Sequence, residues 1–273
     1  MLTLDPKTAQ ALAPSLERVL IVDPTPGTAR LIGDLLHNIG PGRVWTATST
    51  SQGLSLADGL SPQLIFVEYE GGAVDGVIFT RKLRRSTFLC RKAPVIMATT
   101  QATPAVITAA RDAGVHEFLR KPFTFKDLTR RLEAVTLHPR GWVEAVGYVG
   151  PDRRRFNSAG YAGRRKRRSD HAEDPVQARI AQALKIVSAA LPAVELDRQQ
   201  AFRALKAQAI ELQGAGALAN NAPLVQAARA LHLTLSEIAS PQALTRAAVE
   251  ADAQRLLALQ PPSAKPARSP VAA

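Results

Sequence analysis

The chain has 273 residues, 46% apolar and 21% charged, a composition that fits one or two globular domains and excludes a disordered or fibrous protein. Its single cysteine, Cys90, excludes an internal disulfide, and the first ten residues lack the basic flank and apolar run of a secretion signal, so we expect a cytoplasmic protein. The longest uncharged stretch, residues 93–110, contains two prolines and a glutamine, which excludes a membrane span.

Positive charge is concentrated in two stretches, although the net charge of the whole chain is +12. Residues 140–168 contain nine Lys or Arg and two acidic residues, and residues 76–92 contain six Lys or Arg and no acidic residue. Clustered positive charge repels itself unless an anion neutralises it, so the longer stretch predicts an anionic ligand or partner. We interpret the cations of the other stretch, Arg84, Arg85 and Arg91 among them, as the solvated end of a helix and its loop, and assign them no site.

The region after an N-terminal tail of residues 1–17 alternates between strand and helix patterns. Its first segment, RVLIVD, is an apolar β-branched run without polar alternation, as in a strand that is covered on both faces. Strands are predicted at residues 18–23, 43–49, 63–68, 94–100 and 116–121, and helices at residues 29–39, 51–60, 77–85, 104–113 and 125–135. This alternation predicts an α/β fold with a doubly wound, five-stranded parallel sheet, whose ligands bind beyond the carboxyl ends of the strands. Chemistry is therefore expected at Asp23, Glu68, Thr99 and Lys121.

Four segments, VLIVDP, LIFVEYEGGAVDG, PVIMATT and FLRKPFTFKDL, carry a family resemblance in their order and spacing. Through them residues 18–137 resemble the flavodoxin-like receiver domains of bacterial response regulators, of the chemotaxis type. The resemblance implies that two acidic residues after the first strand help hold Mg²⁺, that an Asp after the third strand accepts a phosphoryl group, and that a Thr and a Lys-Pro pair sense it. This chain keeps Asp23, Thr99 and the Lys121–Pro122 pair, but has Pro24 at the second acidic position and Glu68 at the acceptor position.

These two departures affect the phosphoryl transfer that the resemblance implies. Such a transfer relies on positioning and on a metal that neutralises developing charge. Glu68 places its carboxylate one methylene further out, and a misplacement of about 1 Å can lower a rate roughly a hundredfold. Pro24 also weakens the Mg²⁺ site, so we expect a degenerate acceptor pocket that is not phosphorylated. Glu68 then either imitates the phosphorylated state or forms a structural ion pair with Lys121, and the second interpretation is the simpler one.

Residues 138–172 form an arginine-rich linker by composition, since Pro, Gly and Arg dominate and no helical or strand period is present. Within it YVGPDRRR is followed thirteen residues later by an imperfect copy, YAGRRKRR. Aromatic rings stack on bases, worth roughly 1–3 kcal/mol per base, and arginine forks suit phosphate oxygens and the edge of guanine. The candidate ligand-binding residues are Tyr148, Gly150, Pro151, Asp152, Arg153, Arg154, Arg155, Tyr161, Arg164 and Arg165.

The first copy of this motif resembles the arginine-rich tail that follows receiver domains in a group of chemotaxis-type proteins. The resemblance implies cyclic di-GMP as the ligand, wrapped by arginines and aromatic rings. Two alternatives stay open: electrostatic attachment to an acidic protein or an anionic membrane face, and nonspecific binding of nucleic acid, which we favour least.

The remaining residues are rich in Ala, Leu and Gln, with apolar residues at helical spacing. Four helices are predicted around residues 180–191, 202–212, 225–235 and 244–256, with breaks at Gly214 and Gly216 and at Ser240 and Pro241. They predict a four-helix domain over residues 173–260, an α-helical bundle, followed by a disordered tail of residues 261–273. The stretch from Ala209 resembles a histidine phosphotransfer domain with Ile210 at the His position, although an unrelated bundle is an equal interpretation.

Taken together, these patterns predict a non-catalytic signalling adaptor of a bacterial two-component network. Its partners are expected to be a kinase, a motor or other signalling proteins, and cyclic di-GMP is the expected switch. No metal site and no enzymatic activity are predicted. The alternatives are a genuine response regulator that a histidine kinase phosphorylates on an unorthodox carboxylate, and a basic tether to nucleic acid or membrane.

Overall fold

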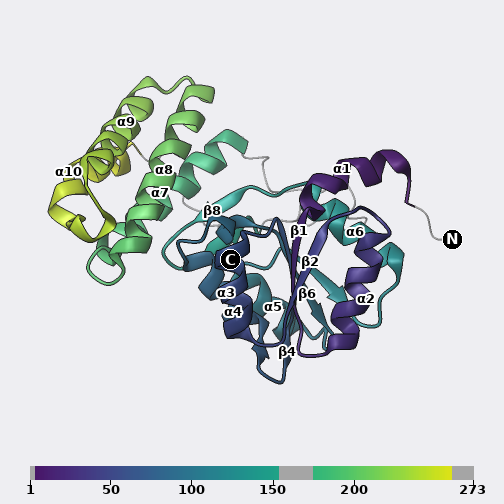
Figure 1. Ribbon diagram of the computed structural model, residues 1–273. Helices are drawn as coiled ribbons and strands as arrows, with labels where there is room; N and C mark the ends of the chain where they lie inside the picture. The colour runs from purple at the N-terminus through teal and green to yellow at the C-terminus, as the bar shows by residue number, and fades with distance from the viewer. Residues whose placement is uncertain (1–3, 154–174, 260–273) are drawn as a thin grey trace, which may run out of the picture. The chain divides into compact units, whose positions relative to one another are not determined.

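The computed structural model describes residues 4–153 and 175–259, which fall into two compact units (Figure 1). The first unit contains residues 4–143 and 147–153, and the second contains residues 144–146 and 175–259. The candidate ligand residues Arg154, Arg155, Tyr161, Arg164 and Arg165 lie outside the described residues.

A five-stranded parallel sheet forms the centre of the first unit, as predicted. Its strands are β1 (Arg18–Val22), β2 (Arg43–Ala47), β3 (Leu64–Glu68), β6 (Val95–Thr99) and β7 (Glu117–Arg120). They pair in the order β2-β1-β3-β6-β7, and every pairing is parallel. The residues of β3 and β6 are almost fully buried, which explains why these segments are apolar without alternation.

Helices cover both faces of the sheet and confirm the doubly wound arrangement. One face packs against α2 (Pro26–His37) and α6 (Phe125–Thr136), and the other against α3 (Thr50–Leu60), α4 (Gly76–Arg85) and α5 (Pro104–Ala113). A short hairpin of β4 (Glu70–Gly71) and β5 (Val74–Asp75) joins β3 to α4, and the 3-10 turn η1 (Leu89–Lys92) precedes β6.

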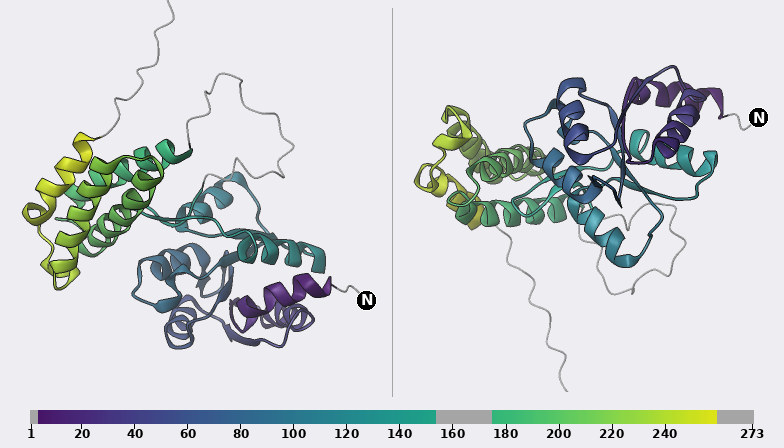
Figure 2. Two further views of the ribbon diagram at one scale, coloured as in Figure 1. Left: turned by 90° about the horizontal axis from the view of Figure 1, so that it is seen from above. Right: turned by 60° about the horizontal axis from the view of Figure 1, so that its bottom comes forward.

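An additional helix, α1 (Pro6–Leu16), occupies the region that the sequence analysis assigned to an N-terminal tail. The side chain of Asp5 caps it by accepting a hydrogen bond from Thr8 N at 3.1 Å. Leu12 and Leu16 are buried in the core beside α2 and α6. Figure 2 shows α1 (purple) next to α6 (teal), with which it is in contact. The tail prediction is therefore wrong for these residues, because they complete the apolar layer on that face.

Two short strands, β8 (Trp142–Glu144) and β9 (Val149–Pro151), lie in the region where no strand was predicted. They form a two-stranded sheet, and Asp152 N donates to Gly141 O at 2.7 Å next to it. We call residues 138–143 and 147–153, which belong to the first unit, the strap. Its strands are too short for alternation to be visible in the sequence.

The second unit contains α7 (Pro175–Ala193), α8 (Arg198–Leu218), α9 (Ala222–Glu237) and α10 (Arg246–Ala258), drawn green to yellow in Figure 1. Helix α7 packs against α8 and α10, and α9 packs against the same two helices. The predicted break at Gly214 and Gly216 is wrong, since both lie within α8. A Cβ on Gly216 would come within 3.0 Å of Val225 Cγ2, so this glycine permits the close approach of α9. The break at Ser240 and Pro241 is present as η3 (Pro241–Ala243).

A helix that spans a membrane must be both long and apolar. None of the helices within residues 4–153 and 175–259 is long and apolar enough to cross a membrane.

Candidate functional site: a carboxylate and lysine pocket

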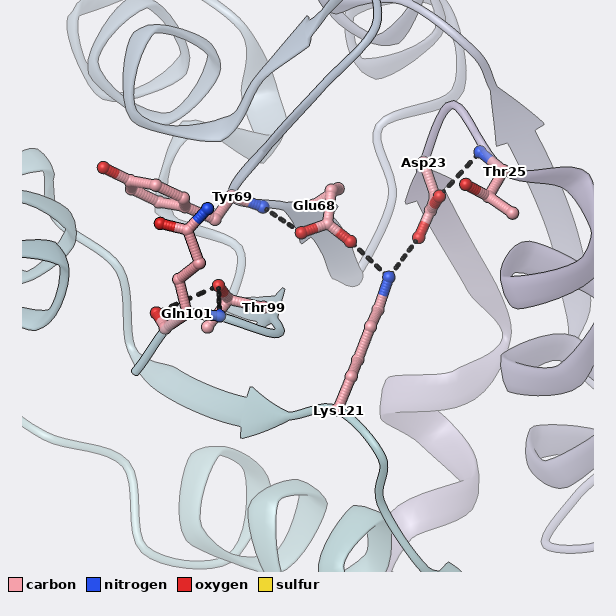
Figure 3. A network of polar contacts seen from close by, with 7 residues as sticks. All are labelled: Asp23, Thr25, Glu68, Tyr69, Thr99, Gln101 and Lys121. Carbon is pink, nitrogen blue, oxygen red and sulfur yellow. Dashed lines mark hydrogen bonds and ion pairs between the residues drawn. The ribbon is translucent and has the colours of Figure 1, made fainter. Parts of the chain in front are cut away.

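The four side chains expected to carry chemistry lie at the carboxyl edge of the sheet. Asp23 directly follows β1, Glu68 and Thr99 are the last residues of β3 and β6, and Lys121 directly follows β7. Since the strands are parallel and paired in register, their carboxyl ends meet at one edge. Three of the four side chains converge there: Asp23, Glu68 and Lys121 (Figure 3).

Lys121 forms ion pairs with both carboxylates. Its Nζ donates to Asp23 Oδ2 at 2.9 Å and to Glu68 Oε2. The other two carboxylate oxygens accept backbone hydrogen bonds: Asp23 Oδ1 from Thr25 N at 2.8 Å, and Glu68 Oε1 from Tyr69 N at 3.0 Å. The Asp23 side chain is only 2% exposed and that of Glu68 is 11% exposed, so water has little access to the pocket. Each of the four carboxylate oxygens has a protein donor instead.

The charge of Lys121 depends on these two partners. Burial by itself lowers the pKa of Lys121, but the hydrogen bonds and negative charges of Glu68 and Asp23 outweigh it, and the pKa is raised above its usual value. Lys121 is therefore a cation at neutral pH, and the pocket contains one positive and two negative groups. Removing one partner from such a pair leaves an uncompensated buried charge.

Thr99 lies at the same edge but takes no part in the ion pairs. Its hydroxyl accepts from Gln101 N at 2.9 Å and donates to Gln101 O at 3.1 Å, a local turn that Figure 3 shows beside the pocket. The side chain is buried, at 2% exposure. Thr99 therefore lies at the carboxyl edge of the sheet, as expected for the end of a strand. Its hydrogen-bond partner, Gln101, comes from the loop after β6.

The residues of this pocket are a poor match for Mg²⁺, which requires near-octahedral coordination by oxygen. Pro24 supplies no side-chain oxygen, and the carboxylates of Asp23 and Glu68 are engaged by Lys121 and by backbone amides. Within the described ranges, no group of three or more His, Cys, Asp or Glu side chains is placed to hold a metal ion.

The described ligand candidates, from Tyr148 to Arg153, fasten the strap to the first unit. The Tyr148 ring is 7% exposed, and its hydroxyl donates to Pro151 O at 2.6 Å. A Cβ on Gly150 would lie 2.7 Å from Gly114 Cα, so the motif glycine permits a close approach of two backbones. Arg140 donates to the carbonyl oxygens of His116 and Asp152.

Arg153 is the last described residue before the rest of the motif. Its guanidinium lies 4.0 Å from the centre of the Tyr148 ring and pairs with Asp112 of α5. Both charged side chains are about two-fifths exposed, at 40% and 41%. The structure thus places Tyr148 and Arg153 together, with the guanidinium over one face of the ring.

The sequence analysis was wrong about Arg84, which is 1% exposed and not part of a solvated helix end. Its Nη1 donates to Arg91 O at 2.6 Å and Ala93 O at 3.0 Å. Its Nε and Nη2 donate to Gly114 O at 3.1 and 3.0 Å, and Nη2 also contacts His116 Nδ1 at 3.1 Å. The Trp142 ring of the strap lies 5.3 Å from the guanidinium carbon. Burial lowers the pKa of Arg84 to about 9.

The burial of Arg84 has a signal in the sequence. The buried residues of α4 follow spacings of three and four, and Arg84 lies four residues after Thr80 on the same face. They are Gly76, Phe79, Thr80, Leu83 and Arg84. Helical periodicity therefore places this arginine on the core face, against the usual preference of arginine for solvent.

Comparisons with known proteins agree with this fold. The family model of the response regulator receiver domain matches residues 19–133. The chain is 28% identical over 118 residues to the "Probable chemotaxis protein CheY" of Rhizobium etli, which covers 43% of this chain and 91% of that protein. It is 32% identical over 117 residues to the KDP operon transcriptional regulatory protein KdpE of Escherichia coli, covering 43% of this chain but only 50% of KdpE.

Part of the chain is also similar to solved structures. The chemotaxis protein CheY4 of Vibrio cholerae has a TM-score of 0.41 and 22% identity, covering 44% of this chain and 98% of that one. A CheY-like receiver domain protein of Methanospirillum hungatei has a TM-score of 0.41 and 20% identity, covering 45% and 96%. The family match, the observed strand order and the positions of Asp23, Thr99 and Lys121 identify residues 19–133 as a response regulator receiver domain.

Proposed function

We propose that this chain is a non-catalytic adaptor of two-component signalling whose receiver domain is not switched by phosphorylation. The observation that carries the proposal is Glu68 at the acceptor position, held with Asp23 by ion pairs to Lys121. Signalling through a receiver domain is common to the relatives, and the proposal concerns how this receiver works.

The chemistry of phosphoryl transfer supports this proposal. An acceptor carboxylate must present a free oxygen in line with the leaving group while a metal neutralises the developing charge. Both oxygens of Glu68 already accept hydrogen bonds, from Lys121 Nζ and from Tyr69 N. Pro24 contributes no metal ligand at the neighbouring position. An attack by Glu68 therefore requires breaking the ion pair without a cation to replace Lys121.

The same geometry favours a structural ion pair over imitation of the phosphorylated state. A carboxylate that imitates the phosphoryl group should engage both sensing residues, Thr99 and Lys121. Glu68 engages Lys121, whereas the Thr99 hydroxyl is bonded to Gln101. We therefore propose that Glu68 satisfies the charge of Lys121 and keeps the receiver in one state.

Incubation of the full chain with acetyl phosphate and Mg²⁺, read by intact mass, tests this proposal. The wild type is expected to gain no phosphoryl group. The double variant Pro24→Asp with Glu68→Asp, which restores the family pattern, is expected to gain one labile phosphoryl group, and Pro24→Asp with Glu68→Ala serves as its matched control. A stoichiometric adduct on wild-type Glu68, or on a neighbouring carboxylate, would overturn the proposal.

We further propose cyclic di-GMP as the switch, bound by the arginine-rich segment that begins at Arg153. The support is the partly exposed side chain of Arg153 beside Tyr148, directly before two more arginines in the sequence. Arginine forks match the phosphates and the guanine edges of this ligand. Because the Tyr148 ring is buried, its replacement is expected to perturb the strap, and Arg153 is the cleaner residue to vary.

Isothermal titration of the full chain with cyclic di-GMP in moderate salt tests this second proposal. Wild type is expected to release heat at tens of micromolar ligand, and the combined Arg153→Ala, Arg154→Ala and Arg155→Ala variant is expected to lose it, while GMP gives none. Absence of heat with the wild type contradicts the proposal. Parallel titrations with single-stranded RNA and with anionic vesicles separate a nucleotide site from a general basic tether through their salt dependence.

A further inference from the structure

Helix α8 of the second unit carries two buried glutamines on one face. Gln200 is 2% exposed and Gln208 is 6% exposed. They are eight residues apart, about 12 Å along the helix, with Ala204 midway between them. Buried Gln is uncommon because a buried amide group without a hydrogen-bond partner destabilises the fold. These two amides therefore need partners.

The partners are Glu144 and Ala145, consecutive residues at the end of β8, in the short segment 144–146 that belongs to the second unit. Gln208 Nε2 donates to the Glu144 carbonyl at 3.1 Å, and Gln200 Nε2 donates to the Ala145 carbonyl at 3.2 Å. Gln200 Nε2 also donates to the Glu144 side chain, at Oε1, at 3.0 Å. Glu144 itself is only 4% exposed.

These contacts combine two kinds of recognition. The bonds to the carbonyls of residues 144 and 145 recognise the backbone, whatever the side chains are. The bond to the Glu144 carboxylate recognises a negative charge, and hydrogen bonds to charged groups are stronger than those between neutral groups. Ala204 is fully buried between the two amides and adds only a methyl group to this face, which leaves room for a backbone to lie close to the helix.

We propose that Gln200, Ala204 and Gln208, the glutamine clamp, form a docking site for a short segment that carries a glutamate, and that residues 144–146 occupy it as an intramolecular ligand. This inference goes beyond the proposed function and depends on neither phosphorylation nor a nucleotide. A tethered segment has an effective concentration of the order of millimolar, so a free peptide of the same sequence competes poorly with it. Removing the tethered Glu144 from the clamp opens the site to such a peptide.

A fluorescent peptide with the sequence of residues 142–147, WVEAVG, is the probe for the open site. It is titrated against full-length wild type and against the Glu144→Lys variant, in which a cation that cannot accept a hydrogen bond replaces the carboxylate. The variant is expected to bind the peptide at least about tenfold more tightly than wild type, because the intramolecular competitor has been displaced.

The clamp residues and the peptide charge supply the controls. Adding Gln200→Ala and Gln208→Ala to the Glu144→Lys variant is expected to abolish peptide binding, and adding Gln226→Ala, an exposed glutamine of α9, is expected to leave it unchanged. The same peptide with lysine in place of glutamate is expected not to bind. The proposal is overturned if the open variant binds no better than wild type, or if loss of the two clamp glutamines has no effect.

Hydrogen exchange of the full chain gives a second test that needs no Glu144 variant. Gln200→Ala and Gln208→Ala are each expected to speed the exchange of the amides of residues 144–146, with Gln226→Ala equal to wild type. If Glu144→Lys loses helical circular dichroism, this comparison decides alone. Unchanged exchange in both clamp variants refutes the docking site.

Discussion

Lys121, which is partly buried, and Arg84, which is fully buried, are cations of the same receiver unit, and their surroundings differ. Lys121 lies beyond the carboxyl ends of the strands and pairs with two carboxylates. Arg84 lies near the residues that precede β6 and β7. There the carbonyls of Ala93 and Gly114 accept hydrogen bonds from it, and the Trp142 ring lies over its guanidinium. The pKa of Lys121 is raised and that of Arg84 is lowered.

This contrast shows which neighbours each cation requires. Two carboxylates compensate the burial of Lys121, so its pocket is stabilised by charge and is sensitive to the loss of any one member. Arg84 has no carboxylate within ion-pair distance among the described residues, and dipoles with an aromatic ring replace the missing anion. The strap that supplies this ring lies beyond the residues that the family model matches.

Removal of the Lys121 charge is expected to have the largest effect of these tests. Lys121→Met leaves the carboxylates of Asp23 and Glu68 together in a pocket with little water, which should destabilise the fold by about 3–5 kcal/mol at neutral pH. Urea unfolding followed by circular dichroism measures it, with the exposed Lys126→Met as the matched control. A loss below about 1 kcal/mol would show that the pocket is more hydrated than its burial indicates.

Removal of the Arg84 charge is expected to cost less, because the desolvation of a cation is relieved at the same time. Arg84→Met leaves the carbonyls of Gly114, Arg91 and Ala93 without this donor, for an expected loss of about 2–3 kcal/mol in the same unfolding experiment. The exposed Arg81→Met on the same helix should lie within about 0.5 kcal/mol of wild type. Equal values for the two variants contradict the structural role of Arg84.

The His116 ring makes the surroundings of Arg84 sensitive to acid. Its Nδ1 is within 3.1 Å of Arg84 Nη2 and accepts from Val95 N at 3.2 Å. Burial, followed by the positive charges of Arg84 and Arg140, lowers the pKa of His116 well below 6.5. Below pH 6.5 the unfolded state therefore binds a proton that the folded state does not, and stability falls as the pH falls towards the folded pKa.

This linkage predicts that wild type loses about 1 kcal/mol through His116 between about pH 6.5 and pH 5.5. The variant His116→Gln should lack this part of the loss, whereas the exposed His138→Gln should retain it. Chemical denaturation at the two pH values measures the difference. Parallel curves for wild type and His116→Gln would show that His116 is protonated in the folded state.

The ion pair between Asp112 and Arg153 is expected to have the smallest effect. Both side chains are substantially exposed, at 41% and 40%, and solvent screens such pairs. A double-mutant cycle with Asp112→Ala and Arg153→Ala should give a coupling of about 0.2–1 kcal/mol that decreases with added salt. A larger coupling that salt does not change would show that this ion pair is shielded from solvent.

The sequence predicted the sheet and its carboxyl edge well, because both depend on local patterns. The runs LIFVE and VIMAT are apolar throughout, since β3 and β6 are covered on both faces, and each receiver helix has its own apolar stripe. Asp23, Glu68 and Lys121 could be placed together because parallel strands that are in register end at one edge. The cyclic di-GMP site and the absence of phosphorylation remain predictions.

Other features depended on contacts between residues far apart in the chain. Helix α1 was predicted to be a tail. Its stability depends on the packing of Leu12 and Leu16 in the core, which its own sequence does not show. Gly216 was taken for a helix end, although it allows α9 to approach α8. The strands of the strap follow from contacts such as Arg140 with His116 O, which join residues 24 positions apart.

Local patterns thus determined that this chain has a parallel α/β sheet with Glu68 at the end of β3, a basic segment and a helical region, since strand and helix periods are properties of short windows. Only the tertiary structure decided which groups surround each cation and accept its hydrogen bonds. Arg81 and Arg84 have the same side chain on one helix, yet one is exposed and the other is enclosed by carbonyls from two separate segments. Solvation and partner geometry are set by the packing of distant segments, and a window of sequence does not contain them.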